Sequence, residues 1–254
     1  MLLEISNLTK HFGGLTAVSG VDLKVDPGEM VGLIGPNGAG KTTVFNLITG
    51  FIKPTKGEVK FKGKNIVGQK PHVIANKGIG RTFQLNPLFA DFTVLQNVAA
   101  SFYLHPKSSL ISAFLNLPGY QRNEDYINKK AKEILDLLGL TTHQDELAKN
   151  LPQGYQKMLG IARALATRPT LLLLDEPLGG MSVGEIEFTM EIIQKIRESG
   201  VTILLVEHNM QIMDIVDRIY VISFGHRIAT GTIEELRKNN EVIEAYFGAQ
   251  IIDT

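Results

Sequence analysis

The chain has 254 residues, with 26 Lys and Arg against 26 Asp and Glu, so its formal net charge is zero. Neutral charge argues against a nucleic-acid binder that works by releasing counterions from phosphates, and the lack of cysteine excludes a disulfide framework and a thiolate site for metal. The first residues lack the basic and long apolar regions of a signal peptide. No apolar run reaches the length of about 18 residues that a membrane span needs, so we expect work at a membrane to require docking to a spanning protein.

The first third of the chain reads as short strands separated by turns. Apolar and polar residues alternate over residues 2–8 and 17–25, and a turn is predicted at residues 10–14. Further along, the pattern predicts a strand at residues 30–34, a helix at 42–50, a strand at 58–63, a short helix at 73–77 and a strand at 79–84. We therefore expect an antiparallel β layer beside the loop that follows residue 34.

Helical spacing dominates the middle of the chain, and buried strands return after it. Helices are predicted at residues 93–102, 124–138 and 154–167. Four consecutive leucines at residues 171–174 indicate a strand buried on both faces of a parallel sheet. Capping-box spacing at Ser182 and Thr232 predicts two helix starts. Between these two helices, a strand is expected at residues 201–206, followed by a hairpin about Gly225.

These patterns predict an α/β fold with a parallel-sheet core, an antiparallel β layer and a helical lobe. Residues 1–84 and 168–254 would form the core with its β layer. Residues 85–167 would form the helical lobe, within one domain that spans residues 1–254.

The loop after residue 34 spells G-x-x-x-x-G-K-T from Gly35 to Thr42, between a strand pattern and a helix pattern. This is the P-loop motif, whose glycines let backbone N–H groups curl around phosphate oxygens at a helix N-terminus. Lys41 would place its charge near the β- and γ-phosphates, and the hydroxyl of Thr42 would reach Mg²⁺. The motif therefore predicts a nucleotide triphosphate and Mg²⁺ as ligands.

Polar side chains follow the other predicted strands. Asp175 ends the leucine strand, where a P-loop enzyme needs a carboxylate for Mg²⁺, and Glu176 follows it as a candidate base for the water that attacks the γ-phosphate. His208 and Gln84 also stand at strand ends. Taken alone, each of these two residues is weak evidence for a functional site, because a lone His or Gln is usually a surface or core residue.

The motifs occur along the chain in the order found in the ATP-binding subunits of ABC transporters. This resemblance covers essentially the whole chain. Residues 11–18, 79–84 and 242–248 look most like the longer ATPase of the branched-chain amino acid importer branch. The resemblance implies that Phe12 stacks on adenine with Val18 packed beside it. The residues implied to hold the triphosphate and Mg²⁺ are Asn37, Gly38, Ala39, Gly40, Lys41, Thr42 and Thr43.

The resemblance also implies roles at the strand ends. Gln84 would contact Mg²⁺ or the attacking water, and the groove at residues 84–97 would receive a coupling helix of the membrane subunit. Asp175, Glu176 and His208 would be the Mg²⁺ carboxylate, the general base and the γ-phosphate switch. The family works as a dimer in which each ATP lies between one P-loop and the partner's signature loop, so Gln153 and Gly154 would contact the partner's nucleotide.

Two departures from the family pattern lie on that partner-facing surface. The signature loop, usually Leu-Ser-Gly-Gly-Gln, reads Leu-Pro-Gln-Gly-Tyr at residues 151–155, so Pro152 replaces a serine hydroxyl. Met181 and Ser182 replace the usual Leu-Asp of the D-loop, and Ser182 is expected to act mainly as a helix cap. We therefore expect a heterodimer with a second ATPase, in which the partner's ATP turns over slowly, although a homodimer remains possible.

Other functions are open at this point. The expected assignment is import across the cytoplasmic membrane, with the chain held peripherally on the cytoplasmic face by permease subunits and served indirectly by a solute-binding protein. An exporter or lipopolysaccharide-moving ATPase is the alternative. A soluble ABC protein acting on ribosomes or DNA is disfavoured by the neutral charge, and a simple P-loop kinase would not explain the motifs together. The transported solute cannot be read from the sequence.

Overall fold

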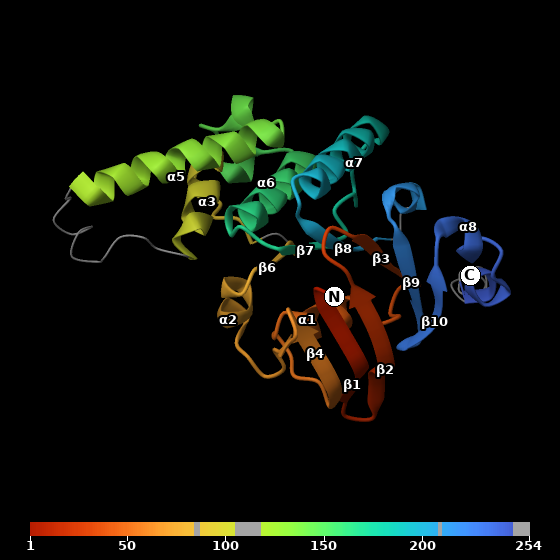
Figure 1. Cartoon of the computed structure of the whole chain (residues 1–254). Coiled ribbons are helices and arrows are strands. Elements are labelled where there is room, and N and C mark those ends of the chain that lie inside the picture. The colour runs from red at the N-terminus through yellow and green to blue at the C-terminus, as the bar shows by residue number, and fades with distance from the viewer. Residues whose placement is uncertain (84–86, 105–117, 208–209, 246–254) are drawn as a thin grey trace.

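The computed structural model of the chain describes residues 1–83, 87–104, 118–207 and 210–245. Figure 1 shows the strands gathered with α1 and α2, while α3, α5 and α6 form a helical layer at one end. One sheet is antiparallel and the other is mainly parallel. The predicted α/β class with a parallel core, an antiparallel layer and a group of helices is therefore confirmed.

The antiparallel sheet has the order β2-β1-β4-β5. Its strands are β1 (Leu3–Phe12), β2 (Leu15–Val25), β4 (Lys56–Phe61) and β5 (Lys64–Asn65). The turn predicted at residues 10–14 is wrong in extent, because β1 pairs with β2 as far as Phe12 opposite Leu15, and only Gly13 and Gly14 turn. The longer strands carry Phe12 to the tip of the hairpin.

The second sheet has the order β10-β9-β3-β8-β7-β6, and only β10 runs antiparallel to its neighbour. Its strands are β3 (Met30–Ile34), β6 (Ile79–Arg81), β7 (Leu171–Asp175), β8 (Thr202–Val206), β9 (Arg218–Ser223) and β10 (His226–Gly231). Asp175 of β7 and Leu33 of β3 both pair with Val206 of β8. The carboxyl ends of the parallel strands therefore meet at one edge of the sheet.

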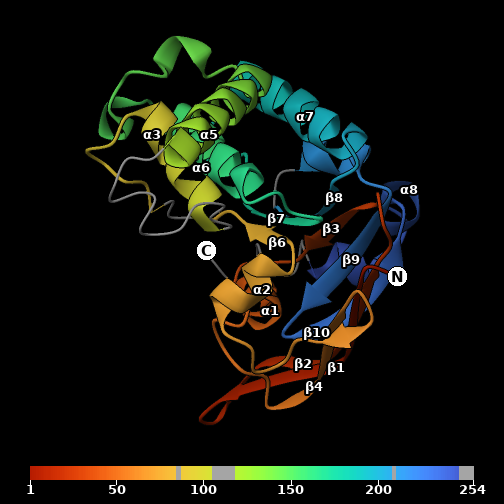
Figure 2. The ribbon, with the colours of Figure 1, turned by 60° about the vertical axis from the view of Figure 1, so that its left-hand side comes forward.

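Both faces of this sheet are buried, as the leucine run predicts. Leu172 and Leu174 point into the core shared with α5, α6 and α7, whereas Leu171 and Leu173 point into the core shared with α1 and the antiparallel sheet. Figure 2 shows these two layers on opposite sides of β7 and β8. The sheet is thus a rigid platform whose carboxyl edge can hold a site.

The core helices are α1 (Lys41–Ile48), α2 (Pro71–Asn76), α7 (Val183–Glu198) and α8 (Ile233–Leu236), and residues 240–245 are helical again. Both predicted capping boxes are present, at Ser182 for α7 and at Thr232 for α8. The hairpin about Gly225 is also confirmed by the pairing of β9 with β10.

The helical layer consists of α3 (Val94–Ser101), α5 (Pro118–Leu137) and α6 (Gln153–Ala166). The helix predicted at residues 124–138 begins earlier, at Pro118, a residue that fits the first turn of a helix. It ends before Gly139, whose φ of 66° suits the left-handed position after a helix. Short 3₁₀ segments that the sequence pattern did not predict occur at Phe102–Leu104, Thr141–His143, Ala148–Asn150 and Met210–Ile215.

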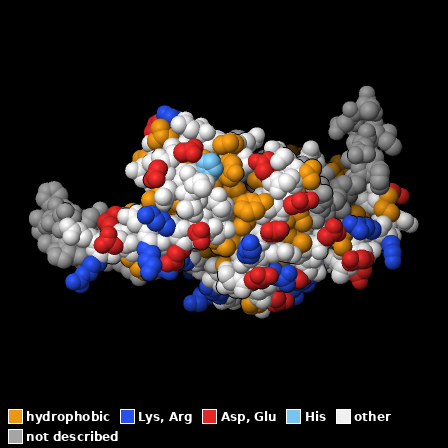
Figure 3. Space-filling model, turned by 90° about the horizontal axis from the view of Figure 1, so that it is seen from above, with side chains coloured by type: hydrophobic (Ala, Val, Ile, Leu, Met, Phe, Trp, Pro, Cys, Tyr) orange, Lys and Arg blue, Asp and Glu red, His pale blue; other side chains and the backbone are white. Residues whose placement is uncertain are grey.

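Seen from above, the molecule carries acidic and basic side chains of both signs side by side, with small hydrophobic groups between them (Figure 3). This interspersion matches the zero net charge, and the described part of this face has no stripe of one sign. None of the helices in the described ranges is long and apolar enough to cross a membrane.

Candidate functional site

The loop between β3 and α1 is held so tightly that two of its positions admit only glycine. A Cβ at Gly35 would overlap the carbonyl oxygen of Ile222 in β9. A Cβ at Gly40, where φ is 105°, would lie 2.5 Å from the carbonyl oxygen of Ala17 in β2. The loop is therefore pinned between strands of both sheets, with the first N–H groups of α1 directed into it.

The side chain of Lys41 lies inside this loop. Its Nζ donates hydrogen bonds to the carbonyl oxygens of Gly35 and Pro36, at 2.6 and 2.9 Å. Burial lowers the pKa of the Lys41 ammonium, and the charges of nearby carboxylates oppose that shift. These carboxylates belong to Glu176, Asp175 and Glu207. The geometry thus sets one cation and several anions around the place where a triphosphate would lie.

The loop and the candidate base line one cavity of about 540 Å³. Phe12 lies at its rim with an exposed ring, which is the position from which a base can be stacked. The lining residues are Phe12, Leu15, Thr16, Ala17, Asn37, Gly38, Ala39, Gly40, Lys41, Thr42, Thr43, Glu176, Phe224 and Gly225. Val18 is fully buried beneath Gly40 and is not among them, so its side chain supports the loop from below.

The carboxylates at the end of β7 are fixed by their neighbours. The backbone N–H of Asp175 donates to the hydroxyl of Thr82 (3.0 Å), and the Asp175 carboxylate forms an ion pair with Arg81. Glu176 has the left-handed φ of 49°, which is uncommon for a residue with a side chain. Its N–H donates to the carbonyl of Val206 (2.9 Å), and its own carbonyl accepts a hydrogen bond from Lys157 Nζ (2.8 Å).

The donors near the loop fit a magnesium ion. The Thr42 hydroxyl and the Asp175 carboxylate are hard oxygen ligands of the kind that Mg²⁺ prefers. Across the described ranges, no group of three or more His, Cys, Asp or Glu side chains could hold a metal ion. An ion at this place would therefore take further ligands from phosphate oxygens and water, which is the usual arrangement for Mg²⁺ bound with a nucleotide.

The signature loop lies at a different cavity, of about 300 Å³, between α6 and α7. Pro152 is the N-cap of α6, and Gly154 lies against the carboxylate of Glu185, where a Cβ would come within 2.5 Å of Oε1. The N–H and the hydroxyl of Ser182 both donate to Glu185 Oε2, at 2.8 and 2.7 Å. The structure therefore joins the signature loop to the D-loop, and within one chain neither lines the P-loop cavity.

Several predicted positions fall outside the described residues. They are Gln84 and His208, whose expected roles stay predictions, and residues 246–248 of the segment quoted for the family resemblance. Gln153 is exposed at the start of α6, with its side chain beside Gly180.

Three residues of this region received no role from the sequence. Arg81 lies in a segment quoted for its family resemblance, but its partner Asp175 is distant in sequence. Phe224 lines the P-loop cavity with 86% of its surface exposed and a left-handed φ of 46°. Glu207 is buried and accepts a hydrogen bond from the N–H of Leu178 (2.7 Å). An aromatic residue before a hairpin glycine, as at Phe224, is a signal that could have been noticed.

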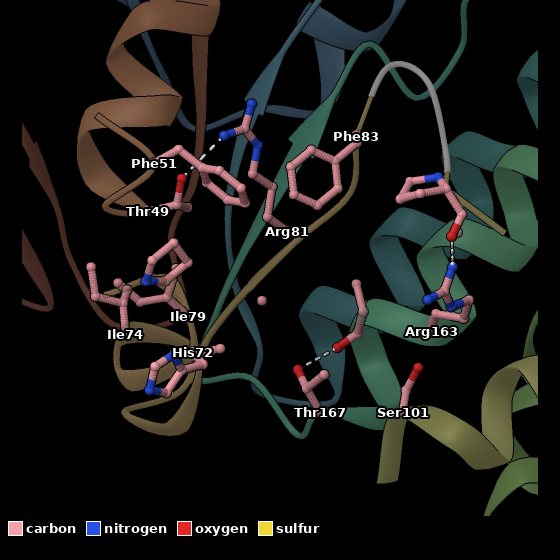
Figure 4. Close-up of a pocket in the computed structure, with 16 residues that line it drawn as sticks. Thr49, Phe51, His72, Ile74, Ile79, Arg81, Phe83, Ser101, Arg163 and Thr167 are labelled. Carbon is pink, nitrogen blue, oxygen red and sulfur yellow. Dashed lines mark hydrogen bonds between the residues drawn. The ribbon is translucent and has the colours of Figure 1, made fainter. Parts of the chain in front are cut away.

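A third cavity, of about 280 Å³, lies where β6 meets α2 and α6. Figure 4 shows Phe51 and Phe83 on either side of Arg81, with Arg163 and Ser101 across the cavity. Arg163 Nη1 donates to the carbonyl of Pro87 (2.5 Å), and its guanidinium lies over the ring of Phe89. The walls are mainly apolar, and the two arginines are partly covered by aromatic rings.

Comparison with known proteins gives consistent matches. The profile of the family described as ABC transporter matches residues 18–179. The chain is 43% identical over 249 residues to the "High-affinity branched-chain amino acid transport ATP-binding protein BraF" of Pseudomonas aeruginosa, and the match covers 97% of this chain and 98% of BraF. The protein with the corresponding name, LivG, of Escherichia coli K12 matches with the same identity and coverage.

Solved structures give the same result for the fold. The ADP conformation of MJ1267, an ATP-binding cassette of an ABC transporter, superposes with a TM-score of 0.83 at 34% identity, covering 97% of this chain and 98% of that chain. The dimeric structure of MJ0796, a bacterial ABC transporter cassette, superposes with a TM-score of 0.80 at 26% identity, covering 91% and 99%. Both similarities extend over more than nine-tenths of the chain.

Proposed function

The chain belongs to the ABC transporter family, and we propose that it is the ATP-hydrolysing subunit that powers import of branched-chain amino acids or related small polar solutes. The names of its relatives BraF and LivG describe branched-chain amino acid transport, and each match covers nearly all of this chain and of the relative. These names favour import over the export or lipopolysaccharide-moving alternative. A binding protein and the membrane subunits, rather than this chain, would select the solute.

The observation that carries this proposal is the shared cavity of the P-loop and Glu176. In our proposal, Phe12 stacks on the adenine ring, and residues 37–43 surround the phosphates with N–H groups and the Lys41 ammonium. The Glu176 carboxylate accepts the proton of the water that attacks the γ-phosphorus. The electron pair of the broken bond then passes to the ADP oxygen, whose charge is stabilised by the loop.

We further propose that Thr42 and Asp175 hold Mg²⁺ together with the nucleotide. When bound, the ion neutralises charge on the β- and γ-phosphate oxygens. The chain's own residues keep that place ordered, because α1 fixes Thr42 and the end of β7 fixes Asp175. Gln84 and His208, which lie outside the described residues, are proposed to contact the attacking water and the γ-phosphate.

ABC ATP-binding subunits work with permease subunits, and a related cassette forms a dimer. We propose a heterodimer with a second ATPase, because Pro152 offers the partner's γ-phosphate neither a hydroxyl nor an N–H. Gln153 and Gly154 would then face the partner's nucleotide from the start of α6. The separation of the signature loop from the P-loop cavity within one chain supports a site completed by a second subunit.

We propose that the chain lies at the cytoplasmic face of the membrane, held there by permease subunits. The cavity between Phe51, Phe83 and Arg163 is also lined by Pro87, which belongs to the segment at residues 84–97 that was expected to receive a coupling helix. A short permease helix with one apolar face suits this cavity, since its walls are mainly apolar.

Copurification and turnover test the proposal. The tagged chain is expressed with the permeases and second ATPase from its genome neighbourhood, and the complex is placed in vesicles to measure ATP hydrolysis and solute uptake. Recovery of two permeases and a different ATPase is the expected result. We expect Glu176→Gln to retain ATP binding and to lower turnover by about 10²–10⁴-fold. Recovery of a single exporter-type permease with two copies of this chain would contradict the import proposal.

A further inference from the structure

Arg81 is the side chain that connects the end of β7 with the P-loop helix. Its Nη2 forms an ion pair with Asp175 Oδ2 at 2.8 Å. Its Nη1 donates to Asn46 Oδ1 at 2.7 Å and to Thr49 Oγ1 at 3.1 Å, both on α1 or at its end. One guanidinium thus links the strand that ends in Asp175 to the helix that begins with the phosphate loop.

This ion pair is almost completely removed from solvent. The side chain of Arg81 is 5% exposed and that of Asp175 is 2% exposed. Burial lowers the pKa of the Arg81 guanidinium, and the Asp175 carboxylate opposes that shift. When one partner of such a pair is removed, the charge left behind is uncompensated, so the remaining side chain tends to leave its position.

Aromatic rings surround the same guanidinium. Its Cζ lies 4.8 Å from the ring centre of Phe83, 5.5 Å from that of Phe45 and 5.9 Å from that of Phe51. Figure 4 shows Phe51 and Phe83 flanking Arg81 at the wall of the third cavity. The side chain therefore has few alternative positions, and it belongs both to that wall and to the surroundings of Asp175.

We propose that Arg81 is a positioning residue that fixes the Asp175 carboxylate for the metal ion of the ATP site. The guanidinium engages Oδ2, so the contact proposed with a metal ion or its water falls to Oδ1. The hydroxyl of Thr82 accepts a hydrogen bond from the backbone N–H of Asp175, so the backbone and the side chain of this residue each have a partner. This inference rests on the proposed role of Asp175 in holding Mg²⁺.

The test compares the affinity for a fluorescent ATP analogue in Mg²⁺ with the affinity in EDTA, using the full chain. In the unmodified chain, Mg²⁺ should strengthen binding. In Arg81→Met we expect the strengthening by Mg²⁺ to fall by about 10–100-fold, the usual effect of removing a partner that orients a metal ligand. Affinity in EDTA should stay unchanged, because no phosphate contact is lost.

Two further variants show whether orientation is the cause. Arg81→Lys keeps the charge but cannot reach Asp175 and α1 at once, so we expect it to restore part of the Mg²⁺ effect. Arg218→Met is the matched control, since Arg218 also pairs with a carboxylate, Glu29, at 2.8 Å and lies over an aromatic ring, Tyr220, at 5.5 Å. Arg218 does not line the P-loop cavity, and its variant should keep the full Mg²⁺ effect.

The outcomes separate this inference from the proposed function. If Asp175→Asn keeps the Mg²⁺ effect, the proposed metal role of Asp175 is wrong. If Asp175→Asn loses the effect and Arg81→Met keeps it, the positioning role of Arg81 is overturned. Equal losses for Arg81→Met in Mg²⁺ and in EDTA would also overturn it, because they would indicate a general structural defect. Should Arg81→Met fail to fold, Arg81→Lys takes its place with a smaller expected loss, and a full Mg²⁺ effect in that variant would overturn the positioning role.

Discussion

Lys41 shows how a single buried charge sets the response of the ATP site to pH. Burial lowers the pKa of its ammonium in the nucleotide-free chain below the ordinary 10.5. Above that lowered pKa, the chain must take up a proton to bind ATP, so we expect affinity to fall up to about tenfold per pH unit. Titrations of an ATP analogue from about pH 7 to about pH 10 measure this dependence.

The lowered pKa of Lys41 weakens ATP binding as pH rises, but it has the opposite effect on the stability of the nucleotide-free chain. Between the lowered pKa and 10.5, the unfolded chain binds more protons at Lys41 than the folded chain. The free energy of unfolding of the nucleotide-free chain should therefore gain from Lys41 as pH rises through this window. The comparison with Lys41→Arg isolates the effect, because the guanidinium stays charged. Constant affinity over the whole range would show that the Lys41 charge is not the group that titrates.

Phe12 provides a second prediction at the scale of one side chain. Phe12 is 47% exposed and lines the P-loop cavity, so it contributes little to the core. We expect Phe12→Ala to weaken ATP binding by about 1–3 kcal/mol, the range for stacking of a base on an aromatic ring. Phe92, which is 45% exposed and lies just before α3, supplies a matched control. Equal losses for Phe12→Ala and Phe92→Ala would argue against stacking at Phe12.

At the scale of elements, the start of α7 decides whether Ser182 is a cap or a reactive part of the D-loop. Ser182 and Glu185 form a capping box at this helix start. We expect Ser182→Ala to destabilise the chain by about 1 kcal/mol, seen as a fall in Tm of about 2–4 °C, with ATP turnover unchanged. Thr232→Ala at the capping box of α8 is the corresponding control. A loss of turnover without a change in Tm would assign Ser182 to the reaction.

The elements that were predicted correctly are those whose signals lie within a short stretch of the sequence. The four leucines at residues 171–174 predicted a strand buried on both faces, and their side chains do enter two cores. The capping boxes predicted the starts of α7 and α8. By contrast, the end of β1 depends on pairing between Phe12 and Leu15, and the glycines after Phe12 favoured a turn over that pairing. The early start of α5 at Pro118 was missed because helix propensity there is weak.

At the scale of the whole molecule, the departure of the signature loop from the family pattern predicts that the two ATP sites of the dimer hydrolyse ATP at unequal rates. In a heterodimer, the partner's ATP would face Pro152, and this chain's ATP would face an intact signature. We expect Pro152→Ser to raise total turnover by at most about twofold, because it can add only the second site. The measurement compares the ATP turnover of the copurified complex with that of this chain alone. Full turnover of this chain as a homodimer would contradict the asymmetry.

Only part of the candidate site could be predicted from the sequence, for a physical reason. The P-loop is contiguous, so its residue types and spacing are sufficient to indicate phosphate binding. The pairing of Arg81 with Asp175 joins residues 94 positions apart, and the contact of Glu207 with Leu178 joins two strand ends. No periodicity relates such residues, because the order of strands in the sheet brings them together. Their roles become visible only once that order is known.

The hydrogen bond from Lys157 to the carbonyl of Glu176 has a consequence for timing. α6 begins at the signature loop and carries Lys157 one turn later, so the same helix touches the proposed partner nucleotide and this chain's proposed base. In the dimer, arrival or loss of a γ-phosphate at one site would displace α6 and, through Lys157, the backbone of Glu176 at the other. In the Pro152→Ser complex, where both sites turn over, the waiting times of the two hydrolysis events should then be correlated, and single-molecule records would show paired rather than randomly spaced turnovers.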